Sequence, residues 1–174
     1  MRKVEVVPYN KQWLFMFAAE SYKLKSIFGN ELIEIQHIGS TSVPGLKAKP
    51  IIDMMPIVKD IKLIDSYNAE MEHLGYHFKG ENGIAGRRYF QKGGDNRTHH
   101  VHIYQIGSPE IERHLAFRDY LCFHPAAREK YGELKEKLAL SFPYDIDSYI
   151  RGKETLASEI ETQALGWYKS SPNR

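Results

Sequence analysis

The sequence predicts an α/β or α+β fold, in which a mixed β-sheet is flanked by α-helices and the C-terminal third of the chain is helical. Apolar residues recur at helical spacing between residues 10 and 29 and through much of the chain after residue 108. Residues 51–58 instead form a short apolar run, which is typical of a central strand covered on both faces. The chain lacks the regular alternation of strands and helices that characterises a doubly wound parallel sheet.

Breaker and capping residues mark the elements expected in the first half of the chain. In order, we expect a strand at residues 3–7, a helix at 10–29, a strand at 31–39, a loop or single helical turn at 39–50, the central strand at 51–58 and a helix at 60–74. The first helix has Asn10 as its N-cap, and its inward face is expected to contain Leu14, Phe17, Ser21, Leu24 and Phe28.

Three short strands followed by helices are expected in the second half. The segments 76–80, 87–93 and 99–106 are separated by Gly, Asn and Asp clusters and predict an antiparallel meander. A helix capped by Ser108 is expected to begin at Pro109 and another at Pro125, and the last helix is expected to span residues 147–167. Residues 170–174 are expected to form a frayed tail.

Length and composition favour a single domain over residues 1–174. The hydrophobic and charged fractions, 42% and 26%, are those of an ordinary globular protein. The net charge of +2 is too small to predict binding to nucleic acid or to an anionic membrane. The single cysteine, Cys122, excludes an intrachain disulfide, and no segment approaches the ~20 apolar residues of a membrane span. These features predict a cytoplasmic protein.

Asp53 is the single charged residue of the expected central strand. An unpaired carboxylate inside a covered strand would be strongly destabilising or would become protonated, so Asp53 needs a partner. A protein cation such as Lys47, Lys49 or an arginine would make a structural ion pair. A divalent metal ion at the edge of the sheet would make a functional site. The strand alone does not distinguish the two.

Gly39 and Ser40 lie ahead of Asp53, at the beginning of a Gly/Pro-rich loop. A glycine permits close approach of the backbone, and the N–H and hydroxyl groups that follow, including those of Thr41, can bind phosphate oxygens. A Gly-Ser pair by itself is more often a simple turn. The order of strand, Gly-Ser turn, loop and buried acid favours a phosphate site.

A second polar face is expected on the strand at 99–106. Alternation puts His100, His102 and Tyr104 on one face and apolar residues on the other. Two imidazoles two residues apart can bind a transition metal such as zinc, or act as acid and base near neutral pH. A solvated face with hydrogen-bonded histidines is the more frequent outcome of this pattern. The stretch also resembles the histidine-triad nucleotide hydrolases, but Tyr104 replaces their third histidine and a long helical region follows.

The stretch HIGSTSVPGLKAKPIID, residues 37–53, resembles the signature of the GrpB-like family of the nucleotidyltransferase superfamily. The likeness extends to the stretches VEVVPYNKQW, RRYFQKG, HHVHIY, RHLAFRDYLCFHP and YIRGK, so that it covers most of residues 4–155. This resemblance implies the nucleotidyltransferase fold, a mixed sheet flanked by helices. That fold agrees with the pattern of elements described above.

The resemblance also implies a site for a nucleoside triphosphate. Superfamily members that transfer a nucleotidyl group place Gly-Ser on the triphosphate and hold two Mg²⁺ ions with an Asp-x-Asp strand and a third acid. Gly39, Ser40 and Asp53 match this pattern. Met55 stands in place of the second acid, and a thioether is a poor ligand for Mg²⁺. The departure argues against an intact two-metal site, and the sequence does not indicate where a third acid lies.

Five further residues are candidates for the same cleft, largely through the resemblance. Lys49, Arg88 and Lys153 are candidate phosphate contacts, and His37 and Arg113 are additional cleft candidates. The ordinary alternative is a solvated cation for the lysines and arginines, and a core histidine bonded to the backbone for His37.

The leading functional hypothesis is an enzyme that binds a nucleoside triphosphate with Mg²⁺ or Mn²⁺ and transfers a nucleotidyl group to an acceptor. It would use Ser40 and Asp53, with His100 or His102 as a metal ligand or base. One alternative is a module with the same fold that binds a nucleotide or docks a partner without catalysis. Another is a metal-dependent phosphohydrolase built around the two histidines. Nothing in the sequence indicates the acceptor, the nucleotide base or the oligomeric state.

Overall fold

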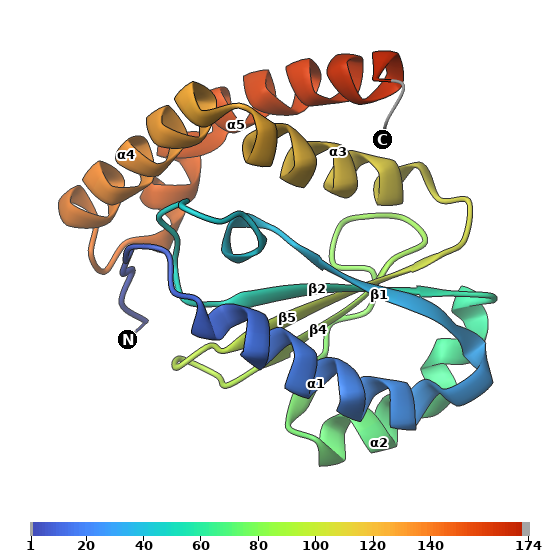
Figure 1. Ribbon diagram of the computed structural model, residues 1–174. Helices are drawn as coiled ribbons and strands as arrows, with labels where there is room; N and C mark the ends of the chain where they lie inside the picture. Colours follow the sequence, from blue (N-terminus) through green and yellow to red (C-terminus); the bar gives the residue numbers. More distant parts are fainter. Residues whose placement is uncertain (1, 172–174) are drawn as a thin grey trace.

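A five-stranded β-sheet forms the centre of the computed structural model, which describes residues 2–171 (Figure 1). The strands are β1 (Leu32–Ile38), β2 (Ile52–Val58), β3 (Tyr76–Phe78), β4 (Arg88–Lys92) and β5 (His99–Gln105), and their order across the sheet is β1-β2-β5-β4-β3. Strands β2 and β5 are parallel, and the other neighbouring pairs are antiparallel. The mixed sheet predicted from the sequence is therefore confirmed.

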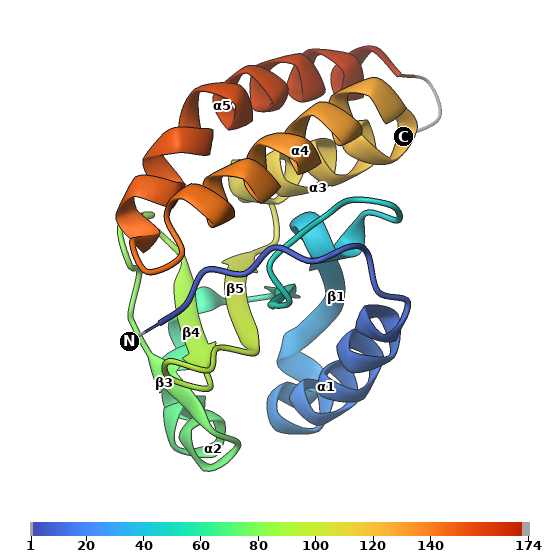
Figure 2. The ribbon, with the colours of Figure 1, turned by 90° about the vertical axis from the view of Figure 1, so that its left-hand side faces the viewer.

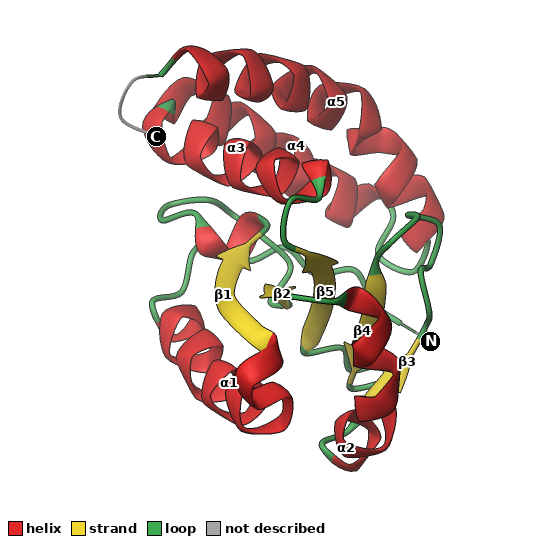
Figure 3. Cartoon of the chain, turned by 90° about the vertical axis from the view of Figure 1, so that its right-hand side faces the viewer, coloured by secondary structure: helices red, strands yellow, loops and turns green. Residues whose placement is uncertain are grey.

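Helices lie on both sides of this sheet (Figure 2, Figure 3). Helices α1 (Gln12–Phe28) and α2 (Asn68–His73) lie on one side, and α3 (Pro109–Phe123), α4 (Pro125–Ser141) and α5 (Ile146–Ser170) lie on the other. The prediction of a helical C-terminal third is confirmed. Within residues 2–171, none of the helices has the length and apolar character needed to span a membrane.

The inward face of α1 differs by one position from the predicted one. Trp13, Leu24 and Phe28 are buried, whereas Leu14, which was expected on this face, is 50% exposed. The Trp13 ring packs edge-on against Tyr9, with 5.4 Å between the ring centroids. Because a tryptophan buries more apolar surface than a leucine, Trp13 takes the inward position in the first turn.

Residues 3–7 were predicted to form a strand, and that prediction is wrong. Val7 makes only an isolated bridge to Ala48, and the Val4 N–H donates to the Pro143 carbonyl at 2.8 Å. The Val4 side chain packs with Tyr149 of α5. The apolar residues of this segment are therefore buried against the helical side of the molecule and not in the sheet.

Two helical predictions also need correction at their ends. The segment expected to form one helix at residues 60–74 begins as a 3₁₀-helix, Ile61–Tyr67, and only α2 is α-helical. The frayed tail was expected from residue 170, but α5 continues to Ser170. Its last turns are held because Trp167 packs on Tyr120, with 5.8 Å between the ring centroids. Residues 172–174 of the expected tail lie outside the described residues.

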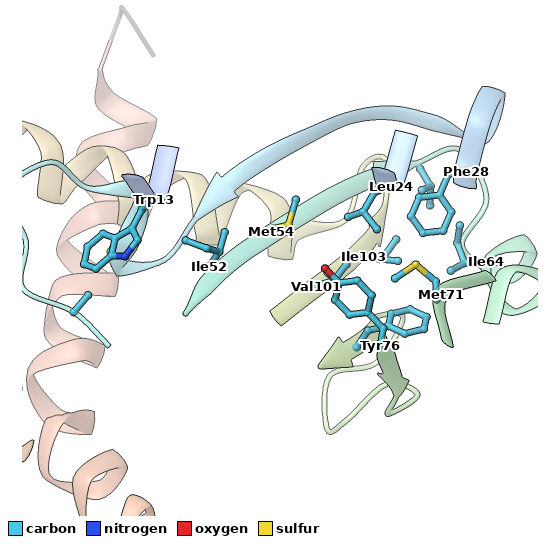
Figure 4. Packing of buried hydrophobic residues seen from close by; sticks show 13 residues of the cluster. Trp13, Leu24, Phe28, Ile52, Met54, Ile64, Met71, Tyr76, Val101 and Ile103 are labelled. Atoms are coloured by element: carbon cyan, nitrogen blue, oxygen red, sulfur yellow. The ribbon is translucent and has the colours of Figure 1, made fainter. Parts of the chain in front are cut away.

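Strand β2 is covered on both faces, as its apolar run predicts. Ile52, Met54 and Val58 face α1 and α2 and join a core cluster that includes Trp13 and Leu24 (Figure 4). Met55 and Ile57 face the other way and pack with Ile38 and Tyr104, under α3. Asp53 is therefore the one charged side chain of a central strand, at the end where β2 begins.

Replacing Met54 by alanine is expected to lower the free energy of unfolding by about 2–5 kcal/mol, because the side chain is fully buried and its removal leaves a cavity. Urea unfolding followed by circular dichroism measures this change. The control Leu140→Ala replaces a side chain that is 79% exposed and should change the free energy by less than about 0.5 kcal/mol. Equal losses in the two variants would contradict this description of the core.

Candidate functional site

Asp53 lies on the face of the sheet that packs against α3. Along β2 this face is apolar at Met55 and Ile57 and polar at Asp53. In the parallel pairing of β2 with β5, Asp53 is opposite His100. Alternation along β5 puts His102 on the same face. The next residue of β2 on this face, Met55, is fully buried. The sheet thus brings one carboxylate and two imidazoles together near the start of two central strands, β2 and β5.

Both imidazoles contact the same oxygen of Asp53. The distance to Oδ1 is 3.0 Å from His102 Nε2 and 3.3 Å from His100 Nδ1, and the Asp53 side chain is 26% exposed. Burial alone would raise the pKa of Asp53, but hydrogen bonds from His100 and His102 outweigh it and hold that pKa well below its usual range. The structural alternative, an ion pair of Asp53 with Lys47, Lys49 or an arginine, is not formed among residues 2–171, and Lys47 pairs instead with Glu136 at 3.0 Å.

Gly39 is required by the close approach of the backbone to Asp53. Its φ angle is +71°, and a Cβ atom built on it would lie 2.6 Å from Asp53 Oδ2. The 3₁₀ turn Ser40–Ser42 follows immediately. The second carboxylate oxygen therefore faces the Gly-Ser turn, while the first faces the imidazoles.

Three lysines meet at this turn. Lys135 of α4 is buried and donates from Nζ to Ser40 Oγ at 2.7 Å. Lys49, Lys135 and Lys153 line one cavity of about 200 Å³ together with Ser40, Thr41, Asp53 and His100. Among residues 2–171, no carboxylate lies within ion-pair distance of these three ammonium groups. The cavity therefore carries an excess of positive charge.

Burial and repulsion from neighbouring cations lower the pKa values of two of these lysines, Lys49 and Lys135. Burial, with the charges of Lys153 and Arg2, lowers the pKa of Lys49 to about 8. Burial, with the charges of Lys153 and Lys49, lowers the pKa of Lys135 well below its ordinary value. An anion placed between them would relieve both effects.

A second cavity, of about 370 Å³, meets the first at Ser40, Asp53 and Lys153 and extends between α3 and α5. Its lining combines the aromatic rings of Phe117 and Tyr131 with polar groups that include Arg113 and His114. Asp53 and Ser40 therefore lie at the junction of a cationic cavity and a mixed, partly aromatic one.

Three of the sequence candidates do not lie in the cationic cavity. Arg88 pairs with Asp65 at 2.8 Å on β4. His37 is buried, contacts the Thr41 hydroxyl at 3.0 Å and stacks on Phe17, and burial lowers its pKa to about 4. Arg113 pairs with Glu110 at 2.6 Å and lines the second cavity. The structure brings together the remaining candidates: Gly39, Ser40, Thr41, Lys49, Asp53, His100, His102 and Lys153.

Sequence reasoning missed Lys135 and His114. The signal for Lys135 was present, because Tyr131, Lys135 and Ala139 recur at four-residue spacing and all three are buried in α4. A lysine at an inward position of an amphipathic helix is unusual, because a buried ammonium group needs a polar partner. His114 contacts the Tyr104 hydroxyl at 3.3 Å, and burial lowers its pKa to about 3. No motif pointed to it.

The resemblance described from the motifs implies divalent cations, and the residues present offer ligands for one cation but not for two. The ligand atoms of Asp53, His100 and His102 all lie within 4.8 Å of one another. Among residues 2–171, no hydrogen bond is directed at Asp53 Oδ2, which faces the Gly-Ser turn. A single carboxylate oxygen of this kind, completed by phosphate oxygens and water, suits Mg²⁺ or Mn²⁺. Met55 is buried and offers no oxygen for a second ion.

Comparison with known proteins extends the likeness over nearly the whole chain. Residues 3–163 match the family described as GrpB protein. The UPF0157 protein YqkA of Bacillus subtilis is 51% identical over 99% of this chain, and the chain spans about half of its length, 50%. The crystal structure of the conserved protein GrpB from Enterococcus faecalis is 46% identical, with a TM-score of 0.92 over 95% of this chain and 100% of that one.

A more distant likeness is to Cid1, solved in complex with its short product ApU. It is 14% identical, with a TM-score of 0.51 over 75% of this chain and 42% of Cid1, and this likeness concerns the fold alone. The fold and the sequence agree with the resemblance described from the motifs. The chain therefore belongs to the GrpB family and has the fold of the nucleotidyltransferase superfamily.

Proposed function

We propose that this protein binds a nucleoside triphosphate together with one divalent cation and transfers a nucleotidyl group to an acceptor, with release of pyrophosphate. The observation that carries the proposal is the cavity where Lys49, Lys135 and Lys153, all without a carboxylate partner in residues 2–171, meet Asp53. Lys135 is buried, and burying an ammonium group without an anion is strongly unfavourable. A triphosphate supplies the missing negative charge, and Asp53 supplies the carboxylate for a cation.

Each residue of the cavity has a defined part in this proposal. The Ser40 hydroxyl and the N–H groups of its turn would donate to phosphate oxygens, and the three lysines would neutralise them. Asp53 Oδ2 would hold the cation, which supplies further charge neutralisation at the phosphates when it is bound. The second cavity, with Phe117 and Tyr131, has the mixed aromatic and polar lining that a nucleoside requires.

Thermal unfolding with ATP, GTP, CTP or UTP, each with and without Mg²⁺ or Mn²⁺, tests the proposal. At a concentration of roughly 100 times the Kd, a bound nucleotide stabilises by about 2.7 kcal/mol, and the midpoint should rise by roughly 5–10 °C. We expect this rise for at least one nucleotide, and only with the cation present. The site variant for comparison is Gly39→Ala, whose Cβ would collide with the Asp53 carboxylate. This substitution should remove the rise in the unfolding midpoint. No shift with any nucleotide would overturn the proposal.

Binding without transfer is the second candidate, and Met55 favours it. A fully buried methionine replaces the second acid that a two-metal reaction uses, so one cation has to suffice. Product analysis with a small-molecule extract as the source of acceptors separates the candidates. Pyrophosphate release supports nucleotidyl transfer, inorganic phosphate supports a phosphohydrolase, and tight binding without either product supports a binding module.

A further inference from the structure

The two histidines beside Asp53 each have an arginine on their far side. Arg97 Nη1 lies 3.1 Å from His100 Nε2, and Arg87 Nη1 lies 3.4 Å from His102 Nδ1. The opposite ring nitrogens, His100 Nδ1 and His102 Nε2, face Asp53 Oδ1 at 3.3 and 3.0 Å. The groups therefore form a continuous row of arginine, imidazole, carboxylate, imidazole and arginine.

This row determines which ring nitrogens carry protons. A guanidinium group has only N–H donors and cannot accept a hydrogen bond. His100 Nε2 and His102 Nδ1 must then present lone pairs to the arginines. Each neutral ring carries its proton on the nitrogen that faces Asp53, so both imidazoles donate to Oδ1. Neither ring presents a lone pair toward the cavity.

The arrangement is the reverse of an ordinary metal-binding histidine. A histidine that ligates a metal nearly always donates its other N–H to a carboxylate, a backbone carbonyl or a water molecule. Here the outer partner of each ring is a donor. A metal ion on these imidazoles would force an N–H of each ring against an N–H of an arginine.

Arg87 is held in place, so that it cannot easily turn away. Its side chain is buried, and it donates to the carbonyl oxygens of Glu81 at 3.1 Å and Asn82 at 2.7 Å. Its guanidinium also stacks over the Tyr89 ring, 4.7 Å from the centroid. Arg97 is fixed less firmly, through one bond to the Gly94 carbonyl at 3.0 Å.

We propose that Arg87 and Arg97 fix His102 and His100 as N–H donors that position Asp53, and that Asp53 Oδ2 alone remains to hold a cation. The site then selects ions that prefer oxygen ligands and are completed by phosphate and water, such as Mg²⁺ and Mn²⁺, over zinc and its neighbours, which prefer imidazole. This inference rests on the proposed function, because selection matters only if Asp53 binds a cation. His102 is accordingly a positioning residue and not a base.

Nitrogen NMR of the unmodified protein tests the proton positions directly. Long-range ¹H–¹⁵N correlation of uniformly labelled protein distinguishes the two neutral forms of each ring. We expect His100 to be protonated on Nδ1 and His102 on Nε2, with both signals unchanged when Zn²⁺ is added in equal amount. A proton on the nitrogen facing the arginine in either ring would overturn the proposal.

Replacing the arginines should convert the site into a binder of transition metals. Glutamine can accept the N–H of an imidazole, so Arg97→Gln and Arg87→Gln free the inner nitrogens for a metal. We expect Co²⁺ affinity, read from its visible absorption, to rise about tenfold or more in each variant. Arg88→Gln is the matched control, because Arg88 pairs with Asp65 outside the row, and it should leave Co²⁺ affinity unchanged.

The same samples separate this inference from the proposed function. Wild-type protein that binds Co²⁺ as tightly as the glutamine variants overturns the inference, even if MgATP still stabilises the protein. If the expected proton positions are found but no nucleotide stabilises the protein, the proposed function fails while the assignment of the two rings stands. Arg97→Gln covers the case in which Arg87→Gln does not fold, since Arg97 lies in a partly exposed loop.

Discussion

Asp53→Asn is expected to remove the cation-dependent part of nucleotide binding. Asparagine keeps one oxygen for the imidazole N–H groups, but it is neutral and cannot replace a carboxylate as the ligand of Mg²⁺. The affinity for MgATP should fall at least about 100-fold, or ~2.7 kcal/mol. Thermal unfolding at increasing MgATP concentrations measures the change.

Asp65→Asn is the matched control for this substitution. Asp65 is half exposed and pairs with Arg88, and an exposed ion pair contributes little to stability. Nucleotide affinity should be the same as in the wild type. If Asp53→Asn also binds MgATP with wild-type affinity, the carboxylate holds no cation and the proposed function has to be abandoned.

Lys135→Met is expected to stabilise the protein without ligand and to weaken its binding of nucleotide. The Lys135 ammonium is buried, is repelled by Lys153 and Lys49, and has Ser40 as its hydrogen-bond partner. Replacing buried charges by apolar side chains of similar size is often stabilising by about 1–4 kcal/mol. Nucleotide affinity should fall about tenfold or more, because one charge-assisted phosphate contact is lost. Urea unfolding and nucleotide titration measure the two changes.

The stability difference between Lys135→Met and the wild type should depend on pH. The pKa of Lys135 is 10.5 when it is exposed and well below that in the folded protein. Between these two values the unfolded chain binds more protons, so wild-type stability gains from this residue as the pH rises. The difference should therefore be larger at about pH 7 than at about pH 9.5.

Lys137→Met controls for the general effect of losing a lysine from α4, because Lys137 is exposed on the same helix. It should change neither stability nor nucleotide binding appreciably. A stability difference for Lys135→Met that is the same at both pH values would show that the buried amine is not its source.

The sequence predicted the mixed sheet and the side chains that share a strand face, because both depend on strand alternation. The period of two puts His100 and His102 on one face, and a strand that is apolar on both faces must be central, so Asp53 and the histidines meet when β2 pairs with β5. The order of strand, Gly-Ser turn, loop and buried acid indicated the Gly-Ser turn, and the family resemblance agreed with it. Local patterns and recognisable motifs thus identified Gly39, Ser40 and Asp53 and the two histidines, but not Arg87 or Arg97.

The contribution of the helical side could not be predicted in the same way. Spacing places Lys135 on the inward face of α4, but only packing of α4 against the turn at Ser40 shows what the lysine meets. The role of Arg87 was missed for a similar reason. Arg88 was the predicted candidate, but Arg88 pairs with Asp65 and it is Arg87 that contacts His102. The strand β4 begins at Arg88, and which neighbour turns toward His102 depends on the shape of the preceding loop.

The cationic cavity is assembled from two parts of the chain that are far apart in sequence. Asp53 belongs to β2 and the Ser40 turn follows β1, whereas Lys135 and Lys153 belong to α4 and α5. Under the proposed function, a polyanion bound between these elements would link the C-terminal helices to the sheet. Binding would then stabilise the contact between the two parts of the molecule, and the protein with bound polyanion would be the more rigid form.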